Sequence, residues 1–446
     1  MLTAMTAPDR FPDWTSLREG ERAAATETCR ERLDRIGRRL HAVASLCSPR
    51  SPGGGILAGL PYVAKDMIAT GRSDPSWGCA QPLMSNAPVA TVISRLDRAG
   101  ASLIGTSEMT ELAYEPSGIN PTRGAVLNPW NFDYAPGGSS SGSAALVASG
   151  CCFAALGSDT GGSVRIPAHC CGVTGLKPSW GKIPVEGTMA LAPSLDTIGL
   201  LARSAADLAL LWSGLFDETV PSISGAVSGV VLTDAVDESD PEIAEICRTA
   251  IGALGRLGIH VDTRAGFPEA ADKNCLLVMQ AEAARTHRER LNDERVDAVL
   301  RKRLGKGLAI SDGELTDALE AQESLRDKFL ADQFGDADVL LMPVMPIKTP
   351  RVAEVDPGSP EFKARTLYAL SRFTRFVNYL GLPALAVPAG FDSRGMPVGL
   401  QLIGRPGSDV LLLALGTLLQ ADTHWHSRAP AEVSAGRMTE KGLPSH

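Results

Sequence analysis

A chain of 446 residues with a hydrophobic fraction of 44% is long enough to bury a large core without disulfide bonds. Its 51 acidic and 43 basic residues give a formal net charge of -8, which argues against a nucleic-acid partner, because such a partner favours a basic surface. The nine cysteines include no C-x-x-C pair, and we interpret them as buried free thiols in a reducing cytoplasm, with zinc or disulfide use left open.

The N-terminal part of the chain predicts helices alternating with strands. Apolar residues at helical spacing indicate an amphipathic helix over 17–46, and a Pro/Gly/Ser loop follows at 48–55. A short buried strand then ends at Lys65. A helix over 89–99 and a strand over 101–104 form a helix-to-strand unit of the kind found in α/β folds.

Loop-forming residues dominate the next part of the chain, over 115–143. A helix is expected to open at 143, followed by a buried strand over 152–157. This stretch is too short and too interrupted to span a bilayer, and the first residues lack the pattern of a secretory signal. The elements predicted beyond it are helices over 205–215, 240–258, most of 280–334 and 410–419, strands over 339–343 and 384–388, and a hairpin around 393–395.

Two Gly/Ser-rich loops, 136–143 and 157–163, stand out from the rest of the sequence. They flank an apolar segment, which a flexible linker would lack, so we expect one rigid core to anchor both loops. Glycine lets the backbone approach a substrate closely, and consecutive N–H groups stabilise a developing oxyanion. A serine at the end of the second loop is therefore a candidate nucleophile for acyl transfer, provided that a base activates it.

The base that would activate such a serine stays open at this point. None of the seven histidines lies in a setting that marks it as catalytic, and the distance of His169 along the chain from the second loop specifies no geometry. Lys65 is the other candidate, because burial lowers the pKa of a lysine and Lys65 ends an apolar run. For any single lysine, a solvated surface position is the ordinary alternative.

Several segments together resemble the amidase signature family, over 59–419 and most weakly over 215–335. Residues 59–66 (GLPYVAKD) resemble its lysine segment, 137–143 (GGSSSGS) its Gly/Ser signature, and 157–167 (GSDTGGSVRIP) its nucleophile segment. Their shared order makes the resemblance specific. Further support comes from 193–199, 381–388 and 395–401.

The resemblance implies a Ser-cisSer-Lys triad. Carried over to this chain, Ser163 attacks an amide carbonyl, Ser139 takes its proton and later delivers one to the leaving amine, and neutral Lys65 takes the proton from Ser139. The peptide bond between Gly138 and Ser139 would be cis. The oxyanion hole would consist of the backbone N–H groups of Thr160, Gly161, Gly162 and Ser163.

The resemblance also assigns supporting residues and a fold. Ser140 would support the triad through hydrogen bonds, and Asp159 and Arg165 would hold the nucleophile loop in shape. The implied reaction needs no metal and no organic cofactor. The implied fold is a single α/β domain with a central mixed β-sheet flanked by helices. We divide the chain into an N-terminal helical segment (1–50), the amidase signature domain (51–430) and a C-terminal tail (431–446).

The substrate pocket is assigned by analogy of position alone. Tyr114, Met189 and Leu191 would give it an apolar lining, which favours an aryl or alkyl amide ahead of urea-like or carbamate-like substrates. Packing of these side chains in the core is an equally good interpretation. The chain departs from the family's pattern at positions that bear on substrate preference: Met67 and Glu108 stand where Asn is frequent, and Ser141 where Gly is.

Two alternative functions stay open beside a small-molecule amidase. One is the glutaminase subunit of a tRNA-dependent amidotransferase, although that class typically carries a tyrosine-rich segment where 303–318 has no tyrosine. The other is an α/β-hydrolase-type esterase, because 138–142 fits G-x-S-x-G and would make Ser140 the nucleophile, with a histidine as base. For the amidase we expect a small-molecule amide, no nucleic acid, no membrane and, from the family, a homodimer.

Overall fold

An 11-stranded sheet runs through the computed structural model, which describes residues 11–48 and 54–430. The strands are β1 (Val43–Leu46), β2 (Pro61–Lys65), β3 (Ser102–Ser107), β4 (Ala154–Asp159), β5 (Thr174–Lys177), β6 (Thr197–Ala202), β7 (Ser228–Leu232), β8 (His260–Arg264), β9 (Val339–Pro343), β10 (Ala384–Phe391) and β11 (Pro397–Gly404). Their order across the sheet is β1-β3-β2-β4-β6-β5-β10-β11-β9-β7-β8. Parallel and antiparallel neighbours both occur, so the sheet is mixed.

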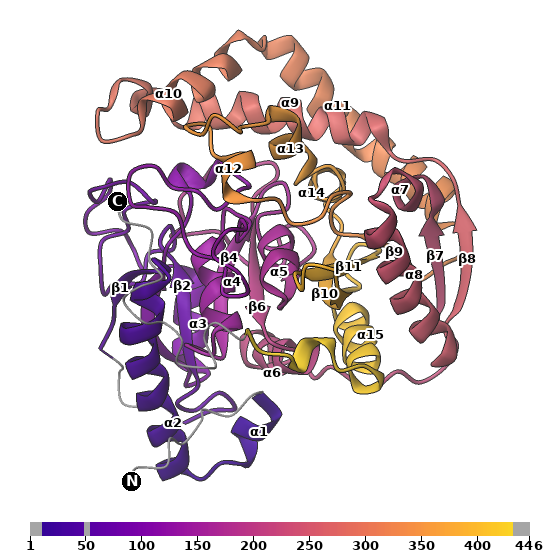
Figure 1. The fold of residues 1–446 in the computed structure, drawn as a ribbon, viewed down its shortest axis with the longest axis horizontal. Coiled ribbons are helices and arrows are strands. Elements are labelled where there is room, and N and C mark those ends of the chain that lie inside the picture. Colours follow the sequence, from indigo (N-terminus) through magenta and orange to yellow (C-terminus); the bar gives the residue numbers. More distant parts are fainter. Residues whose placement is uncertain (1–10, 49–53, 431–446) are drawn as a thin grey trace.

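Helices flank this sheet, as Figure 1 shows. They are α1 (Phe11–Ser16), α2 (Glu19–Arg32), α3 (Thr91–Arg98), α4 (Ser141–Ala148), α5 (Arg165–Cys171), α6 (Ala205–Phe216), α7 (Thr233–Glu238), α8 (Pro241–Arg256), α9 (Glu269–Thr286), α10 (Ala298–Gly305), α11 (Asp312–Phe329), α12 (Val352–Val355), α13 (Ala364–Ala369), α14 (Arg375–Tyr379) and α15 (Asp409–Asp422). None of the helices in the described ranges is long and apolar enough to cross a membrane. The expected α/β fold, with a central mixed sheet and flanking helices, is confirmed.

The ends of three neighbouring strands define the region where the site lies. Strand β2 pairs in parallel with both β3 and β4, so the carboxyl ends of all three strands meet at one edge of the sheet. Those ends carry Lys65, Ser107 and Asp159. Every residue of the three strands is buried, which agrees with their apolar composition and places polar side chains at the strand ends in a low-dielectric setting.

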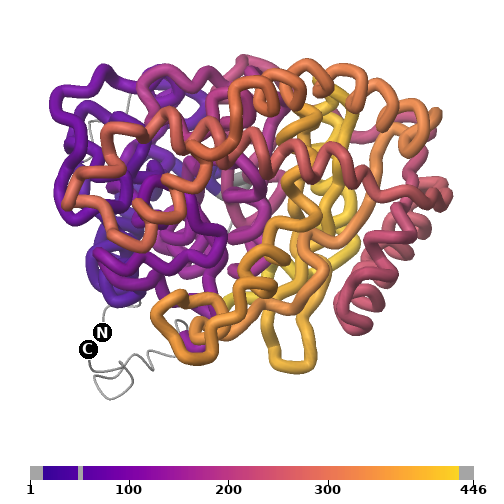
Figure 2. Tube along the Cα trace, turned by 90° about the horizontal axis from the view of Figure 1, so that it is seen from above, coloured from indigo at the N-terminus to yellow at the C-terminus, as the bar shows by residue number. Residues whose placement is uncertain are grey.

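A helical layer lies over this end of the sheet. Figure 1 shows α9, α10 and α11 above the strands, and Figure 2, seen from above, shows the same segments crossing the top of the molecule. Helix α9 contacts α14, and α14 directly precedes β10 along the chain. The region in which the resemblance is weakest, 215–335, therefore supplies much of the cover over the site.

Some sequence expectations about elements were wrong. The helix predicted over 17–46 ends earlier: α2 continues through a π-helical turn, Leu33–Gly37, and Val43–Leu46 instead forms β1, paired antiparallel with β3. Tertiary pairing here overrides the helical pattern. The predicted tail, 431–446, lies outside the described residues, and the division of the chain into segments stays a prediction.

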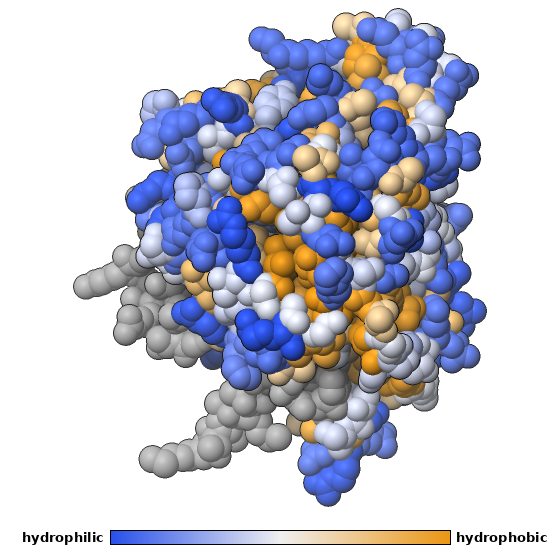
Figure 3. Space-filling view, turned by 90° about the vertical axis from the view of Figure 1, so that its right-hand side faces the viewer, coloured by the Kyte–Doolittle hydropathy of each residue, from blue (hydrophilic) through white to orange (hydrophobic). Residues whose placement is uncertain are grey.

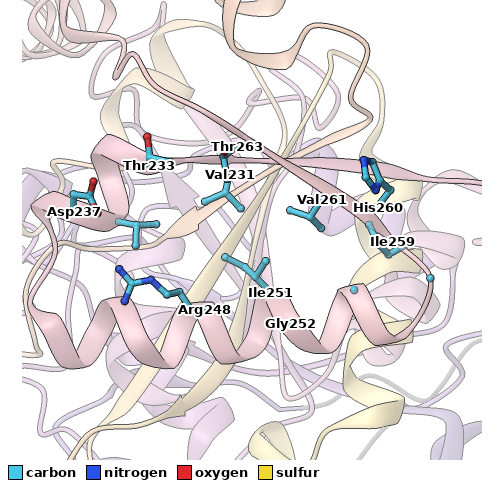
Figure 4. Close-up of a pocket in the computed structure, with 13 residues that line it drawn as sticks. Val231, Thr233, Asp237, Arg248, Ile251, Gly252, Ile259, His260, Val261 and Thr263 are labelled. Atoms are coloured by element: carbon cyan, nitrogen blue, oxygen red, sulfur yellow. The ribbon is translucent and has the colours of Figure 1, made fainter.

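A cavity of about 710 Å³ lies between α8 and the outer strands β7 and β8. Ile251 of α8 and Val261 of β8 line it, as Figure 4 shows. Figure 3 shows apolar side chains gathered in the middle of the corresponding face of the molecule, surrounded by hydrophilic ones. None of the residues predicted for the site lines this cavity, and the predicted triad lies instead around the ends of β2 and β4.

Candidate active site

Lys65 is fully buried at the end of β2. Its Nζ donates hydrogen bonds to the hydroxyl of Ser139, at 2.6 Å, and to that of Ser158, at 2.8 Å. Burial lowers the pKa of Lys65 from 10.5 to about 7, although the negative charges of Asp159 and Asp196 oppose the shift. An amine with this pKa is present in both protonation states near neutral pH, as a proton acceptor requires.

Ser139 follows a cis peptide bond with Gly138 and is fully buried. The Gly138 N–H donates to Pro116 O at 2.7 Å, and Ser139 O accepts a hydrogen bond from the Thr110 N–H at 3.3 Å. A Cβ at Gly138 would lie 2.7 Å from Gly118 N, so the close backbone approach requires glycine. The segment that follows β3 thus holds the first Gly/Ser loop against Lys65.

Ser163 ends the second Gly/Ser loop, two residues before the start of α5, and is partly exposed. Its carbonyl oxygen accepts a hydrogen bond of 3.2 Å from the Ser140 N–H, so its backbone lies against the residue that follows Ser139. The structure thereby brings the two Gly/Ser loops and Lys65 together at one edge of the sheet. Ser163 is thus partly exposed, whereas Ser139 and Lys65 are fully buried.

Ser140 is fully buried and bonded to the backbone of β4. Its hydroxyl donates to Ser158 O and accepts from the Ser158 N–H, both at 3.2 Å. The side chain that the esterase alternative makes a nucleophile is therefore engaged with backbone groups. His169 lies on α5, and its Nδ1 accepts from the Gly399 N–H at 3.0 Å; burial lowers the pKa of His169 to about 3. These contacts count against a Ser140–histidine pair.

Asp159 and Arg165 form a buried ion pair, 2.8 Å between Oδ1 and Nη2. The pair lies at the second Gly/Ser loop, 157–163, which we call the nucleophile loop after its predicted role. The carboxylate also accepts hydrogen bonds from the N–H groups of Gly162, at 2.8 Å, and Val164, at 3.2 Å. Burial alone would raise the pKa of Asp159, but the charge and hydrogen bonds of Arg165 hold this pKa well below its usual range. The carboxylate thus stays ionised and binds backbone N–H groups at the end of the loop, and its supporting role in catalysis stays a prediction.

One of the four N–H groups predicted for the oxyanion hole, that of Gly162, has a different partner in the structure. The Gly162 N–H points to Asp159 Oδ1, so in this conformation it is used to hold the loop. The N–H groups of Thr160, Gly161 and Ser163 remain as the predicted oxyanion donors. The conformation of Gly162, with a φ of 127°, is one that residues with a side chain rarely adopt, and it turns the loop at this point.

The predicted pocket residues fall into two groups. Met189 and Leu191 are 5% and 2% exposed and pack in the main hydrophobic core. Leu191 is nevertheless close to the nucleophile loop, because its N–H and the Thr160 hydroxyl both donate to the carboxylate of Asp196. Tyr114 lies farther along the segment after β3, with the Arg303 guanidinium 5.6 Å from the centre of its ring.

The structure adds residues to the site that sequence reasoning missed. The Thr374 hydroxyl donates to Gly161 O at 2.6 Å, and Asn378 and Gln401 accept hydrogen bonds from Arg165. A Cβ at Gly161 would lie 3.5 Å from the sulfur of Met279, which places α9 beside the nucleophile loop. These residues lie far along the chain from the loops, so only a pattern shared among relatives could have pointed to them.

Comparisons with known proteins identify the family. The Amidase family model matches residues 40–413. A subunit of the glutamyl-tRNA(Gln) amidotransferase of Nitrosococcus oceani is 34% identical, with 85% of this chain and 86% of the relative covered. A solved amidase structure is 31% identical, with a TM-score of 0.80 and coverage of 89% and 95%. The corresponding solved subunit of the Thermotoga maritima glutamyl-tRNA(Gln) amidotransferase is 26% identical, with a TM-score of 0.81 and coverage of 95% and 96%.

Fold, site and matches together define the class of protein, an enzyme that acts on carbon–nitrogen bonds. The chain belongs to the amidase signature family.

Proposed function

We propose that the chain hydrolyses an amide through an acyl-enzyme on Ser163. The Ser163 oxygen attacks the carbonyl carbon while its proton passes to Ser139, whose own proton passes to neutral Lys65. The oxyanion is stabilised by N–H groups of the nucleophile loop. The carbon–nitrogen bond then breaks, and the amine leaves with a proton returned from Lys65 through Ser139. Water, activated by the same relay, cleaves the ester and releases the acid.

One observation carries this proposal: the Lys65 Nζ is fully buried 2.6 Å from the Ser139 hydroxyl. A fully charged ammonium would be costly there, and the lowered pKa reflects that cost. The backbone contact between Ser140 and Ser163 supports placing the nucleophile beside the relay. The ionised Asp159 supports a fixed nucleophile loop, which catalysis by orientation requires.

Glutamine is the first of two candidate substrates. The relatives that are 34% and 26% identical are both subunits of glutamyl-tRNA(Gln) amidotransferases. They favour a glutaminase subunit that passes ammonia to a partner over the small-molecule amidase that the sequence predicts first. On this proposal a further protein chain, and not only a small molecule, is a partner of the enzyme.

A small apolar amide is the second candidate. Met189 and Leu191 are apolar, and the Leu191 backbone shares Asp196 with Thr160 of the nucleophile loop. The sulfur of Met279 adds an apolar group beside Gly161 of this loop. The solved amidase that is 31% identical is consistent with this alternative.

Release of ammonia or amine from glutamine and from a panel of aliphatic, aryl and urea-type amides tests the proposal. Turnover should resist EDTA and collapse in Ser163→Ala, Ser139→Ala and Lys65→Ala. Ser141→Ala is the matched control, because Ser141 is a fully buried serine of the same loop whose hydroxyl has no hydrogen-bond partner among the described residues. It should keep its activity.

The outcomes separate the candidates. Turnover of glutamine alone identifies the glutaminase subunit, whereas turnover of small amides without glutamine identifies the small-molecule amidase. Activity that survives both Ser163→Ala and Lys65→Ala would remove the proposed relay and return attention to Ser140.

A further inference from the structure

Two buried carboxyl groups, Asp66 and Glu108, and the partly exposed Arg123 form a cluster that adjoins the proposed relay. Asp66 and Glu108 are 4% and 6% exposed. Arg123 Nη2 lies 2.6 Å from Glu108 Oε1, and Arg123 Nη1 donates to the Ser76 hydroxyl at 2.8 Å. The Ser76 hydroxyl and N–H both donate to Asp66 Oδ2. One guanidinium thus serves two carboxyl groups, Glu108 directly and Asp66 through Ser76.

The charges in this cluster do not balance when both carboxyl groups are ionised. Arg123 is the cation that faces them, and the other groups against Asp66 are the hydroxyls of Ser76 and Thr106 and the Cys47 thiol. Glu108 Oε2 is buried and has no hydrogen-bond partner among the described residues. A buried charged oxygen without a partner is costly, whereas a shared proton removes the excess negative charge.

The titration of the two groups agrees with this geometry. Burial raises the pKa of Glu108 to about 7, and the charge of Asp66 adds to the shift while Arg123 opposes it. Burial likewise raises the pKa of Asp66 to about 6, against the hydrogen bonds from Ser76. The pair therefore loses its last proton near neutral pH, and the charge of Asp66 helps to keep that proton on Glu108.

The backbone of the cluster joins the elements that carry the relay. Asp66 directly follows Lys65, and its N–H donates to Ser107 O at 3.1 Å. Glu108 directly follows Ser107, and its carbonyl oxygen accepts a hydrogen bond of 3.0 Å from the Gly142 N–H in the first turn of α4. Glu108 therefore stands where β2, β3 and the start of α4 meet, and Gly142 connects it to the loop that carries Ser139.

We propose that Glu108 is a positioning residue which shares one proton with Asp66, and that loss of this proton loosens the junction holding Lys65 and Ser139 in contact. This inference rests on the proposed function for its effect on activity. Glu108 stands where Asn is frequent in the family. A protonated Glu108 is neutral, as Asn is, which gives this departure from the family's pattern a physical role.

The inference predicts the shape of the pH profile. Activity rises with pH as Lys65 becomes neutral, which gives the acid limb. Ionisation of the Asp66–Glu108 pair, whose last proton also leaves near pH 7, gives the alkaline limb, so the wild-type profile should be a narrow bell. The two limbs thus arise from different groups, and a substitution at Glu108 should move only the second.

The test compares Glu108→Gln with the wild type across the pH range, by kcat/KM and by Tm. Glutamine keeps the shape and the contact with Arg123 but cannot ionise. The acid limb should stay in place, and the alkaline limb should move up by about one pH unit or more. Because the pKa of Glu108 is raised from 4.5 to about 7 in the folded protein, the wild type loses stability as the pH rises between these two values. The Tm of the variant relative to wild type should therefore increase from about pH 4.5 to about pH 7 and level off above it.

Glu111→Gln is the matched control, since Glu111 is buried nearby and outside the cluster, accepting from the Asp297 N–H at 3.0 Å. It should leave the alkaline limb unchanged. An alkaline limb that stays in place in Glu108→Gln, or moves equally in both variants, overturns the inference. Should Glu108→Gln fold poorly, Glu108→Asn replaces it with the same expectation.

Failure of the proposed function is recognised separately. In that case the wild type turns over none of the amides, and the Tm comparison alone decides. A Tm difference between Glu108→Gln and wild type that does not change with pH overturns the shared proton, whatever the activity.

Discussion

Lys65 is the residue whose protonation sets the acid side of the proposed reaction. Its pKa is lowered to about 7 by burial, so the neutral amine predominates only above that pH. Because only the neutral form takes a proton from Ser139, kcat/KM should fall about tenfold for each pH unit below about 7. Lys65→Ala should lose ~10²–10⁴-fold in kcat and should no longer show this limb. Initial rates on the best substrate measure both effects.

A second buried lysine provides the control for this prediction. Lys177 is also fully buried, and burial lowers its pKa to about 7, but its Nζ donates to Pro178 O at 2.7 Å. Lys177→Gln should therefore keep the acid limb. If the acid limb persisted in Lys65→Ala and disappeared in Lys177→Gln, the proton acceptor would be Lys177, and the assignment to Lys65 would be wrong.

Gly162 is the residue whose backbone conformation tolerates no side chain. Its φ of 127° is strained for any other residue, and a Cβ there would collide with the Thr374 hydroxyl. Gly162→Ala should therefore lower the free energy of unfolding by ~1–3 kcal/mol and abolish most turnover, because the loop must move. Thermal unfolding and amide hydrolysis measure the two effects.

The neighbouring glycine supplies the comparison for this variant. A Cβ at Gly161 would meet Met279 and Arg375 at 3.5 and 3.6 Å, which are ordinary contacts. Gly161→Ala should keep the stability of the wild type. Equal destabilisation in the two variants would show that the loop rejects any side chain, and that the conformation of Gly162 is not the cause.

At the scale of elements, the sequence predicted strongly patterned segments well. The strand predicted over 339–343 is β9 with the same bounds, and the predicted hairpin forms between β10 and β11. Strands β5 and β6 were not predicted, since short strands in glycine-containing sequence carry little periodicity. Their place in the sheet depends on partners far along the chain.

The site was predictable to the extent that its residues lie in compact motifs. The motif containing Lys65 and the two Gly/Ser loops identified the groups that the structure brings together, although their catalytic roles stay a prediction. Thr374 and Met279 carry no local signal, because a threonine or methionine in a helical region is usually a packing residue. Gly162 likewise could not be interpreted fully from the sequence. The resemblance of its segment implied an oxyanion donor, and only the structure shows that its N–H donates to Asp159.

Helix α9 is the element that we expect to set acyl-group preference. The Met279 side chain reaches Gly161 of the nucleophile loop, from the region that least resembles the family. Met279→Ala should make room for larger acyl groups and raise their kcat/KM relative to small ones by ~10-fold, the usual effect of a few methylenes in an apolar pocket. A series of amides with increasing acyl length measures the change.

An exposed methionine serves as the matched control for the α9 prediction. Met84 is 43% exposed, whereas Met279 is the methionine whose sulfur lies beside Gly161. Met84→Ala should leave the preference for acyl length unchanged. The assignment of α9 would be wrong if Met279→Ala lowered kcat/KM equally for every acyl length, because that result indicates a loss of packing and not of selectivity.

At the scale of the whole molecule, the site joins two parts of the sheet that are distant in sequence. Lys65 and Asp159 come from β2 and β4, and Gln401 comes from β11. Arg165 connects them, because its guanidinium donates to Asp159 and to Gln401 Oε1 at 2.6 Å. Asn378, just before β10, binds both Asp159 and Arg165. These contacts hold the nucleophile loop against elements from both the N-terminal and the C-terminal parts of the chain.

This arrangement predicts that Arg165→Met destabilises the whole fold and not the loop alone. Removing the guanidinium leaves Asp159 charged and buried, which should lower the free energy of unfolding by ~3–5 kcal/mol. The exposed pair of Arg38 and Asp34, at 2.6 Å, gives the contrast, and Arg38→Met should cost only ~0–1 kcal/mol. Urea unfolding followed by tryptophan fluorescence measures both variants.

A third variant, Arg165→Lys, keeps the charge but loses the planar set of donors, so its loss in the free energy of unfolding should fall between those of Arg165→Met and Arg38→Met. Equal values for Arg165→Met and Arg38→Met would mean that the two parts of the sheet are held by apolar packing alone.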